Sequence, residues 1–144
     1  MAGDDDRALV QRCFEELWGG GDLAVADEIL SPDFVGHAPG ARDLKGRDEL
    51  KGLVGAYRAG FPELAVSVRN QLGEGDKVVT EFDMSGRHTG KWMGVPATGR
   101  SLSLSGQAFS RLQDGLIAEQ WLEWERRKLL EQLGLLPVLD VREE

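Results

Sequence analysis

The chain has 144 residues, of which 41% are hydrophobic and 29% charged, a composition typical of one soluble globular domain. Its net charge of -8, without a basic cluster, argues against a nucleic-acid partner. The single cysteine, Cys13, excludes an internal disulfide, and the acidic N-terminus and short apolar runs predict no membrane segment and a cytoplasmic location.

The first half of the chain has helical periodicity. Apolar residues at three- and four-residue spacing predict an amphipathic helix over residues 5 to 18. Cys13 and Trp18 fall on its apolar stripe, so a buried thiol and a core tryptophan are the favoured interpretations. A glycine run ends this helix, and Asp22 begins a shorter helix that runs to Leu30.

A short strand and a third helix follow. Residues 34 to 37 predict the strand, which Pro39 and Gly40 end. The helix is expected from about Arg47 to Ala59, with Tyr57 on its apolar side, where core packing and contact with a pocket are both open.

From Leu64 onward the hydrophobic period changes to two, which predicts strands joined by glycine-containing turns. The expected strands are 64 to 72, 77 to 87, 101 to 112 and 116 to 125. Helices followed by an antiparallel meander indicate an α+β domain in which the helices cover one face of a curved sheet.

The last strand presents two different faces. Alternation places Ile117, Glu119, Trp121, Glu123 and Glu125 on one side, and Ala118, Gln120, Leu122 and Trp124 on the other. The face with carboxyl groups either meets water or lines a cavity, because burying an unpaired carboxylate is costly. The candidates for the surface of a homodimer formed through the sheet are Leu102, Leu104, Leu122 and Trp124.

Short motifs in a fixed order carry a family resemblance. They include Asp33–His37, Gly86–Gly90, Gly94–Arg100 and Asp114–Trp121. Over roughly residues 7 to 137 the chain resembles the SnoaL-like polyketide cyclase (ester cyclase) group of the nuclear-transport-factor-2-like superfamily. The resemblance implies one domain over residues 1–144 with a tail at 138–144. It also implies a cone-shaped α+β barrel, with three N-terminal helices packed on a strongly curved, mostly antiparallel sheet.

The resemblance further implies a cofactor-free enzyme for a small hydrophobic or aromatic polyketide-like molecule, with no metal. In the family, a pocket carboxylate acts as general acid/base in an intramolecular aldol ring closure. It usually is an aspartate four residues after the tryptophan, and this chain has Glu125 there and a second acid, Glu123, where an apolar residue is expected. Either glutamate has taken over the role, or the site has lost it.

Other residues could complete such a site. An apolar wall such as Trp121 or Trp92 would raise the pKa of the acid. His37, His88 and Gln107 are candidate donors to enolate charge, with His37 and His88 grouped with the glutamates as catalytic candidates. The expected substrate-binding residues are Trp121, Trp92, Tyr57, Gln107, Phe34 and Met93, with Trp92 and Met93 as a lid or as loop anchors.

Each candidate also has a purely structural interpretation. Glu125 could lie near the N-terminus of the next helix, and Glu123 could pair with Arg111 or Arg100 across strands. His37 could be an edge histidine, and His88 could stabilise its loop. Two further functions stay open. One is a non-catalytic module that binds a hydrophobic ligand, and the other is epoxide hydrolase or dehydratase chemistry, in which epoxide opening would use a carboxylate–Arg–carboxylate relay of Arg111 with Glu123 and Glu125 around a water.

Overall fold

The computed structural model describes residues 3–138, so most of the predicted tail, residues 139–144, lies outside the described part. Within it, the helices are α1 (Asp4–Arg12), the π-helical turn η1 (Cys13–Trp18), α2 (Val25–Ile29), α3 (Arg47–Gly60) and α4 (Arg126–Gln132). The strands are β1 (Leu30–His37), β2 (Leu44–Lys45), β3 (Ala65–Glu74), β4 (Lys77–Arg87), β5 (Ser101–Gln113) and β6 (Leu116–Trp124). No helix among the described residues is long and apolar enough to cross a bilayer.

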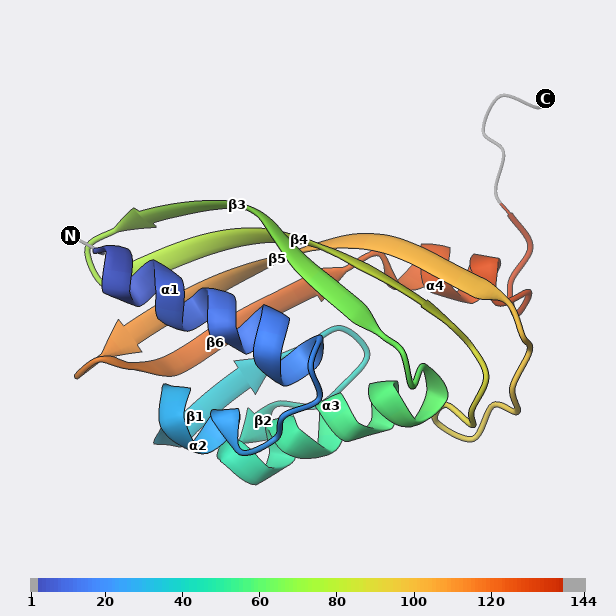
Figure 1. The fold of residues 1–144 in the computed structure, drawn as a ribbon, viewed down its shortest axis with the longest axis horizontal. Helices are drawn as coiled ribbons and strands as arrows, with labels where there is room; N and C mark the ends of the chain where they lie inside the picture. The colour runs from blue at the N-terminus through green and yellow to red at the C-terminus, as the bar shows by residue number, and fades with distance from the viewer. Residues whose placement is uncertain (1–2, 139–144) are drawn as a thin grey trace.

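The strands form one sheet in the order β2-β1-β6-β5-β4-β3. β1 runs parallel to β6 and every other neighbouring pair is antiparallel. The sheet curls without closing, and α1, α2 and α3 lie under its arch, with α4 following β6 at the far end (Figure 1). The predicted α+β cone is confirmed. It differs from the prediction in two ways: the sheet is open, and α4 is a fourth helix.

Most predicted elements are present, with shifted ends. β4 has the predicted bounds, and β3 and β5 end slightly later than expected. The first predicted helix becomes π-helical from Cys13. β1 begins earlier than expected, at Leu30, and β2 pairs with it through Leu44 and Lys45.

The concave face of the sheet packs on the helices. The rings of Phe14 and Phe82 stack with centroids 4.6 Å apart, which joins η1 to β4. The predicted dimer surface is wrong in its residues, because these side chains belong to the core: Leu102, Leu104 and Leu122 are 3% exposed and Trp124 is 7% exposed. Periodicity separates two faces, but only the packing of the helices decides which one is buried.

A β-bulge changes the alternation at the start of β6. Arg111 pairs with Glu119 whereas Leu112 pairs with Ile117, so Ala118 is the extra residue. Ile117 is therefore fully buried and does not share the face of Glu119, which corrects the simple alternation.

Candidate functional site

The candidate residues separate into two regions on opposite faces of the sheet. We call the first the inner chamber; it consists of Trp18, Tyr57, Phe61, His88, Trp92 and Trp124, all buried. We call the second the outer face; it consists of His37, Gln107, Phe109, Arg111, Glu119, Trp121, Glu123 and Glu125, none of them buried.

The inner chamber is a continuous set of aromatic rings. The Tyr57 ring lies 5.8 Å from Trp18, 5.6 Å from Trp92 and 5.4 Å from Trp124, each in an edge-on arrangement. Phe61 lies 6.2 Å from Trp92 and 5.2 Å from His88. Tyr57 thus sits at the centre of side chains that come from η1, α3, β6 and the segment after β4.

The Tyr57 hydroxyl is positioned by a hydrogen bond. It accepts the indole N–H of Trp124 at 3.2 Å. Burial raises the pKa of Tyr57, although the Trp124 hydrogen bond and the charge of Arg126 act in the opposite direction. Because burial favours the neutral phenol, the hydroxyl keeps its proton and can donate it in a hydrogen bond.

His88 is held in one tautomer by Thr98. The backbone N–H of Thr98 points to His88 Nδ1 at 3.2 Å, and the Thr98 hydroxyl lies 3.0 Å from the same atom. A backbone amide can only donate, so Nδ1 is the acceptor and the ring proton resides on Nε2. The Nε2 atom is buried and has no hydrogen-bond partner among the described residues. The predicted loop-stabilising bond therefore exists, and it leaves a free donor on the other side of the ring.

Trp92 anchors the long connection between β4 and β5. Within residues 88 to 100, His88 and Trp92 are the buried residues, and Met93 is 54% exposed. The carbonyl of Gly60 accepts the N–H groups of Thr89 and Gly90 at 3.2 and 3.1 Å. A Cβ at Gly60 would lie 2.4 Å from Trp92 Cβ, so only glycine admits this close approach. The connection thus docks on the end of α3 through the Trp92 indole and the two backbone hydrogen bonds to Gly60.

Little empty space remains inside. The cavity beside the chamber has a volume of about 10 Å³, close to the minimum that can hold one water molecule. Apolar side chains line it: Phe14, Trp18, Val66, Phe82, Met84, Leu122 and Trp124. A ligand larger than a water molecule must therefore displace side chains to enter this cavity, and we refer to the arrangement in the structure as the closed state.

The two glutamates lie together on the outer face, with Gln107. They border an open depression of about 430 Å³ that Arg69 and Ser105 also line. Glu125 Oε1 accepts the backbone N–H of Ser105 at 2.7 Å, and Glu125 immediately precedes α4. Neither glutamate has the apolar wall that was expected, because Trp92 lies in the inner chamber and Trp121 packs beside His37.

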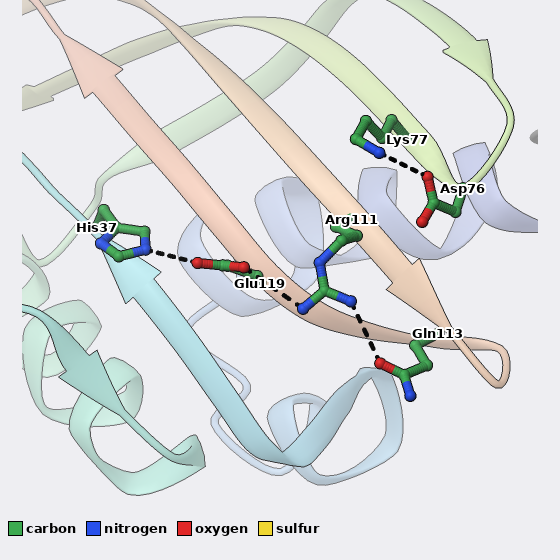
Figure 2. A network of polar contacts seen from close by, with 6 residues as sticks. All are labelled: His37, Asp76, Lys77, Arg111, Gln113 and Glu119. Atoms are coloured by element: carbon green, nitrogen blue, oxygen red, sulfur yellow. Dashed lines mark hydrogen bonds and ion pairs between the residues drawn. The ribbon is translucent and has the colours of Figure 1, made fainter.

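Both ring nitrogens of His37 are engaged on the outer face, and Figure 2 shows the contact with Glu119. Its Nε2 lies 2.8 Å from Glu119 and its Nδ1 lies 2.9 Å from Asp43, and the Trp121 ring stacks on it at 5.3 Å. The hydrogen bonds with Glu119 and then Asp43 raise the pKa of His37, and the bond with His37 lowers the pKa of Glu119. These contacts satisfy both ring nitrogens of His37, although β1 lies between β2 and β6 and is not an edge strand.

Arg111 belongs to the same network. It lies 3.4 Å from Glu119 and donates to Gln113 at 3.2 Å, as Figure 2 shows. The relay of Arg111 with Glu123 and Glu125 is not formed among the described residues, since Arg111 is directed to Glu119.

Two further expectations concern buried residues. Phe34 is fully buried, and its ring lies beside Gly36. Burial raises the pKa of Cys13 to about 12, so the thiol stays protonated, in line with an inert core residue. Trp124 was not among the chamber residues predicted from the sequence. Alternation places it on the same strand face as Leu122, and this face is the inner one, so the shared face could have indicated its position.

The comparisons with known proteins agree on the family. The model of the SnoaL-like polyketide cyclase family matches residues 8–133, so the chain belongs to this family. A comparison with curated proteins found no match.

Solved structures share the whole fold. A candidate SnoaL-like polyketide cyclase from Jannaschia sp. CCS1 is 26% identical over 92% of this chain and 94% of its own, with a TM-score of 0.84. IdmH, a candidate polyketide cyclase from Streptomyces antibioticus, is 30% identical over 90% of this chain and 98% of its own, with a TM-score of 0.78. AclR, a candidate hydroxylase from Streptomyces galilaeus, is 27% identical over 98% of this chain and 88% of its own, with a TM-score of 0.82.

Proposed function

We propose that this protein is a cofactor-free enzyme of the polyketide cyclase type. It closes a ring by an intramolecular aldol reaction in a small hydrophobic molecule that binds in the inner chamber. The observation that carries the proposal is the pair of hydrogen-bond donors, Tyr57 and His88, held by Trp124 and Thr98 within one buried aromatic cluster. The family and the names of IdmH and the Jannaschia protein support the same reaction class.

The reaction needs stabilisation of oxygen charge. Removal of a proton from a carbon next to a carbonyl group gives an enolate, whose carbon attacks a second carbonyl carbon within the same molecule. The resulting alkoxide then takes up a proton. Tyr57 and His88 donate to the oxygen atoms on which negative charge develops, and such donors act most strongly where water is excluded.

We assign proton removal to Glu125. Its backbone lies between Trp124, whose indole enters the chamber, and Arg126, whose charge acts on the Tyr57 phenol. In the closed state its carboxylate accepts the Ser105 N–H, so it must leave this bond to reach a substrate. Glu123 lies two residues before Glu125 and pairs with Gln107 of β5. Its side chain points away from the chamber.

Substrate entry requires the chamber to open. We assign this movement to the segment of residues 88–100, which lies between strands β4 and β5. Its residues are at least partly exposed apart from the buried His88 and Trp92. Its displacement opens the chamber beside Tyr57 and Phe61, and its return excludes water from the reacting groups.

A simple diketone tests the proposal. In ortho-acetylphenylacetone, attack of the acetyl carbon on the other ketone and loss of water give a fluorescent methylnaphthol. We expect the protein to accelerate naphthol formation, and Glu125→Gln to lower the rate by about 10²-fold. Glu123→Gln is the matched control, since it changes a glutamate of the same strand face, and its rate should stay within twofold. Equal rates for the wild type and Glu125→Gln would refute the role of Glu125.

A second function is favoured by one observation. Among residues 3–138 the buried polar side chains are Thr80, His88, Ser110 and Gln120, so every carboxylate there is at least partly exposed. A chamber without a buried acid suits a module that binds a hydrophobic ligand without converting it. Saturable binding of ortho-acetylphenylacetone without any naphthol would select this alternative.

A further inference from the structure

The imidazole ring of His37 lies between two carboxylates. Its Nε2 is 2.8 Å from Glu119 Oε2, and its Nδ1 is 2.9 Å from Asp43 Oδ1. An ionised carboxylate can only accept hydrogen bonds, and a neutral imidazole has a single N–H group. The two hydrogen bonds therefore exist together only when both ring nitrogens carry a proton, so the structure shows the arrangement of an imidazolium between two acceptors.

The two carboxylates are held differently. Glu119 lies on β6 with its side chain 25% exposed, and Arg111 of β5 is 3.4 Å from it (Figure 2). Asp43 lies in the connection between β1 and β2, and its side chain is 58% exposed. His37 is the one partner of the Asp43 carboxylate among residues 3–138. Of the two acceptors, Asp43 is therefore the one that can turn into water when the ring loses a proton.

The connection of residues 38–43 has few other anchors. Ala38 packs against the core, whereas residues 40–43 are all exposed. The N–H of Ala41 donates to the Ala38 carbonyl at 3.3 Å, a turn within the connection itself. The Arg126 guanidinium of α4 lies on Gly40, where an added Cβ would be 2.5 Å from Arg126 Cζ. Within residues 40–43, the Asp43 carboxylate makes the one side-chain hydrogen bond that joins the connection to the sheet.

The charged groups around His37 come from four elements. Glu119 lies on β6 and Asp43 in the connection, while Arg111 of β5 contacts Glu119 and not the ring. Lys45 of β2 pairs with residue 35, two positions before His37. The hydrogen bond with Glu119, and then that with Asp43, raise the pKa of His37. Since an unperturbed histidine titrates near 6.5, the ring loses its proton only at a higher pH.

We infer that His37 is a pH-sensitive latch: the imidazolium holds the 38–43 connection to the sheet through Asp43, and loss of the Nδ1 proton releases Asp43 and lets the connection open. The neutral ring keeps its Nε2 proton, its hydrogen bond to Glu119 and its stack on Trp121. The latch is thus closed at low pH and opens as the pH rises. It lies on the outer face and does not rest on the proposed function.

Nuclear magnetic resonance on the full chain tests both parts of the latch between pH of about 6 and 8.5. The ¹⁵N resonances of the His37 ring report which nitrogen loses its proton, and we expect this to be Nδ1. Magnetisation transfer from water gives the exchange rates of the amides at residues 40–43, each divided by the rate of an unstructured chain at the same pH. We expect their protection to fall by about threefold to fivefold as His37 loses its proton.

Two isosteric variants isolate the contact. In Asp43→Asn the side-chain amide can accept from a protonated Nδ1 and donate to an unprotonated one, so it holds the connection in both states. Protection in this variant should change by less than about 1.5-fold over the same pH range. Asp33→Asn removes another exposed carboxylate next to the same ring-bearing strand segment, on β1, and as the matched control should keep the wild-type change.

The outcomes are decisive in either direction. Loss of the Nδ1 proton together with a fall in protection that disappears in Asp43→Asn would establish the latch. Constant protection while His37 titrates, an unchanged fall in Asp43→Asn, or loss of the proton from Nε2 would each overturn it. No ligand is present in these measurements, so their result is independent of naphthol formation and of the proposed function.

Discussion

The inner chamber and the outer face share strands β5 and β6 but differ in how their polar groups are satisfied. On the outer face, Glu119 binds both His37 and Arg111, and Glu125 binds a backbone amide. In the inner chamber, the donors of Trp92 and His88 have no partner within residues 3–138. A structural network completes its own hydrogen bonds, whereas a ligand site leaves groups for the ligand to complete.

The contrast also concerns charge. Carboxylates are abundant on the outer face, where they are at least partly exposed and two of them pair with Arg111 and Lys128, and the chamber is made of aromatic rings. The acids on one face of β6 therefore indicated a solvent-exposed surface and not the lining of a buried pocket. The N–H groups of Trp92 and His88 were the less conspicuous sequence feature that pointed to the inner chamber.

The largest effect should come from placing a charge on the inner face of β6. Leu122→Asp would bury a carboxylate among apolar side chains, and we expect it to lower the free energy of unfolding by about 4 kcal/mol or more. The neighbouring change Glu123→Ala, on the outer face, should stay within about 0.5 kcal/mol. Urea unfolding measures both, and similar losses for the two variants would contradict the assignment of the faces.

A smaller effect should follow from crowding the anchor of the Trp92 segment. In Gly60→Ala the new Cβ would lie 2.4 Å from Trp92 Cβ, so we expect a loss of about 1–3 kcal/mol. Gly52→Ala is the control on the same helix, because a Cβ there has no neighbour within 4 Å. It should add about 0.5–1 kcal/mol through helix propensity.

Denaturant unfolding of both glycine variants gives the comparison. If Gly60→Ala were as stable as Gly52→Ala, the close contact between α3 and Trp92 would not exist in solution.

The smallest effect concerns pH and the His37 network. The pKa of His37 is higher in the folded protein than in the unfolded chain. The His37 network therefore contributes fully to the free energy of unfolding at pH values below the pKa of the unfolded chain, and this contribution is lost as the pH rises through the pKa of the folded protein. We expect wild-type stability relative to His37→Gln to fall by up to about 1 kcal/mol as pH rises from about 6 to 8.5. Thermal unfolding of the wild type and His37→Gln across this pH range measures the stability difference between them. A difference that grows as the pH rises would contradict the charged pair of His37 with Glu119.

Much of the fold could be predicted from the sequence. The change of hydrophobic period near Leu64 located the strands, and the bounds of β4 were correct because alternation is clean between two turns. The motif order identified the family, which supplied the curved sheet that periodicity alone does not give. β2 was missed because two residues, Leu44 and Lys45, carry no periodic signal.

The site could be predicted only in part. Alternation separated Leu122 and Trp124 from Glu123 and Glu125 correctly, but it contains no information on which set the helices cover. Tyr57, His88 and Trp92 were selected as candidates and do come together. Their meeting depends on the 88–100 segment returning to the end of α3, a long-range contact without a local pattern.

The rate of naphthol formation from ortho-acetylphenylacetone in Tyr57→Phe and His37→Gln tests most directly whether the inner chamber is the site of the reaction. Tyr57→Phe removes the central donor of the chamber and should lower the rate by about 10²-fold. His37→Gln changes the best-connected titratable group of the outer face and should leave the rate within twofold. A normal rate in Tyr57→Phe together with a large loss in His37→Gln would contradict the account and place the reaction on the outer face.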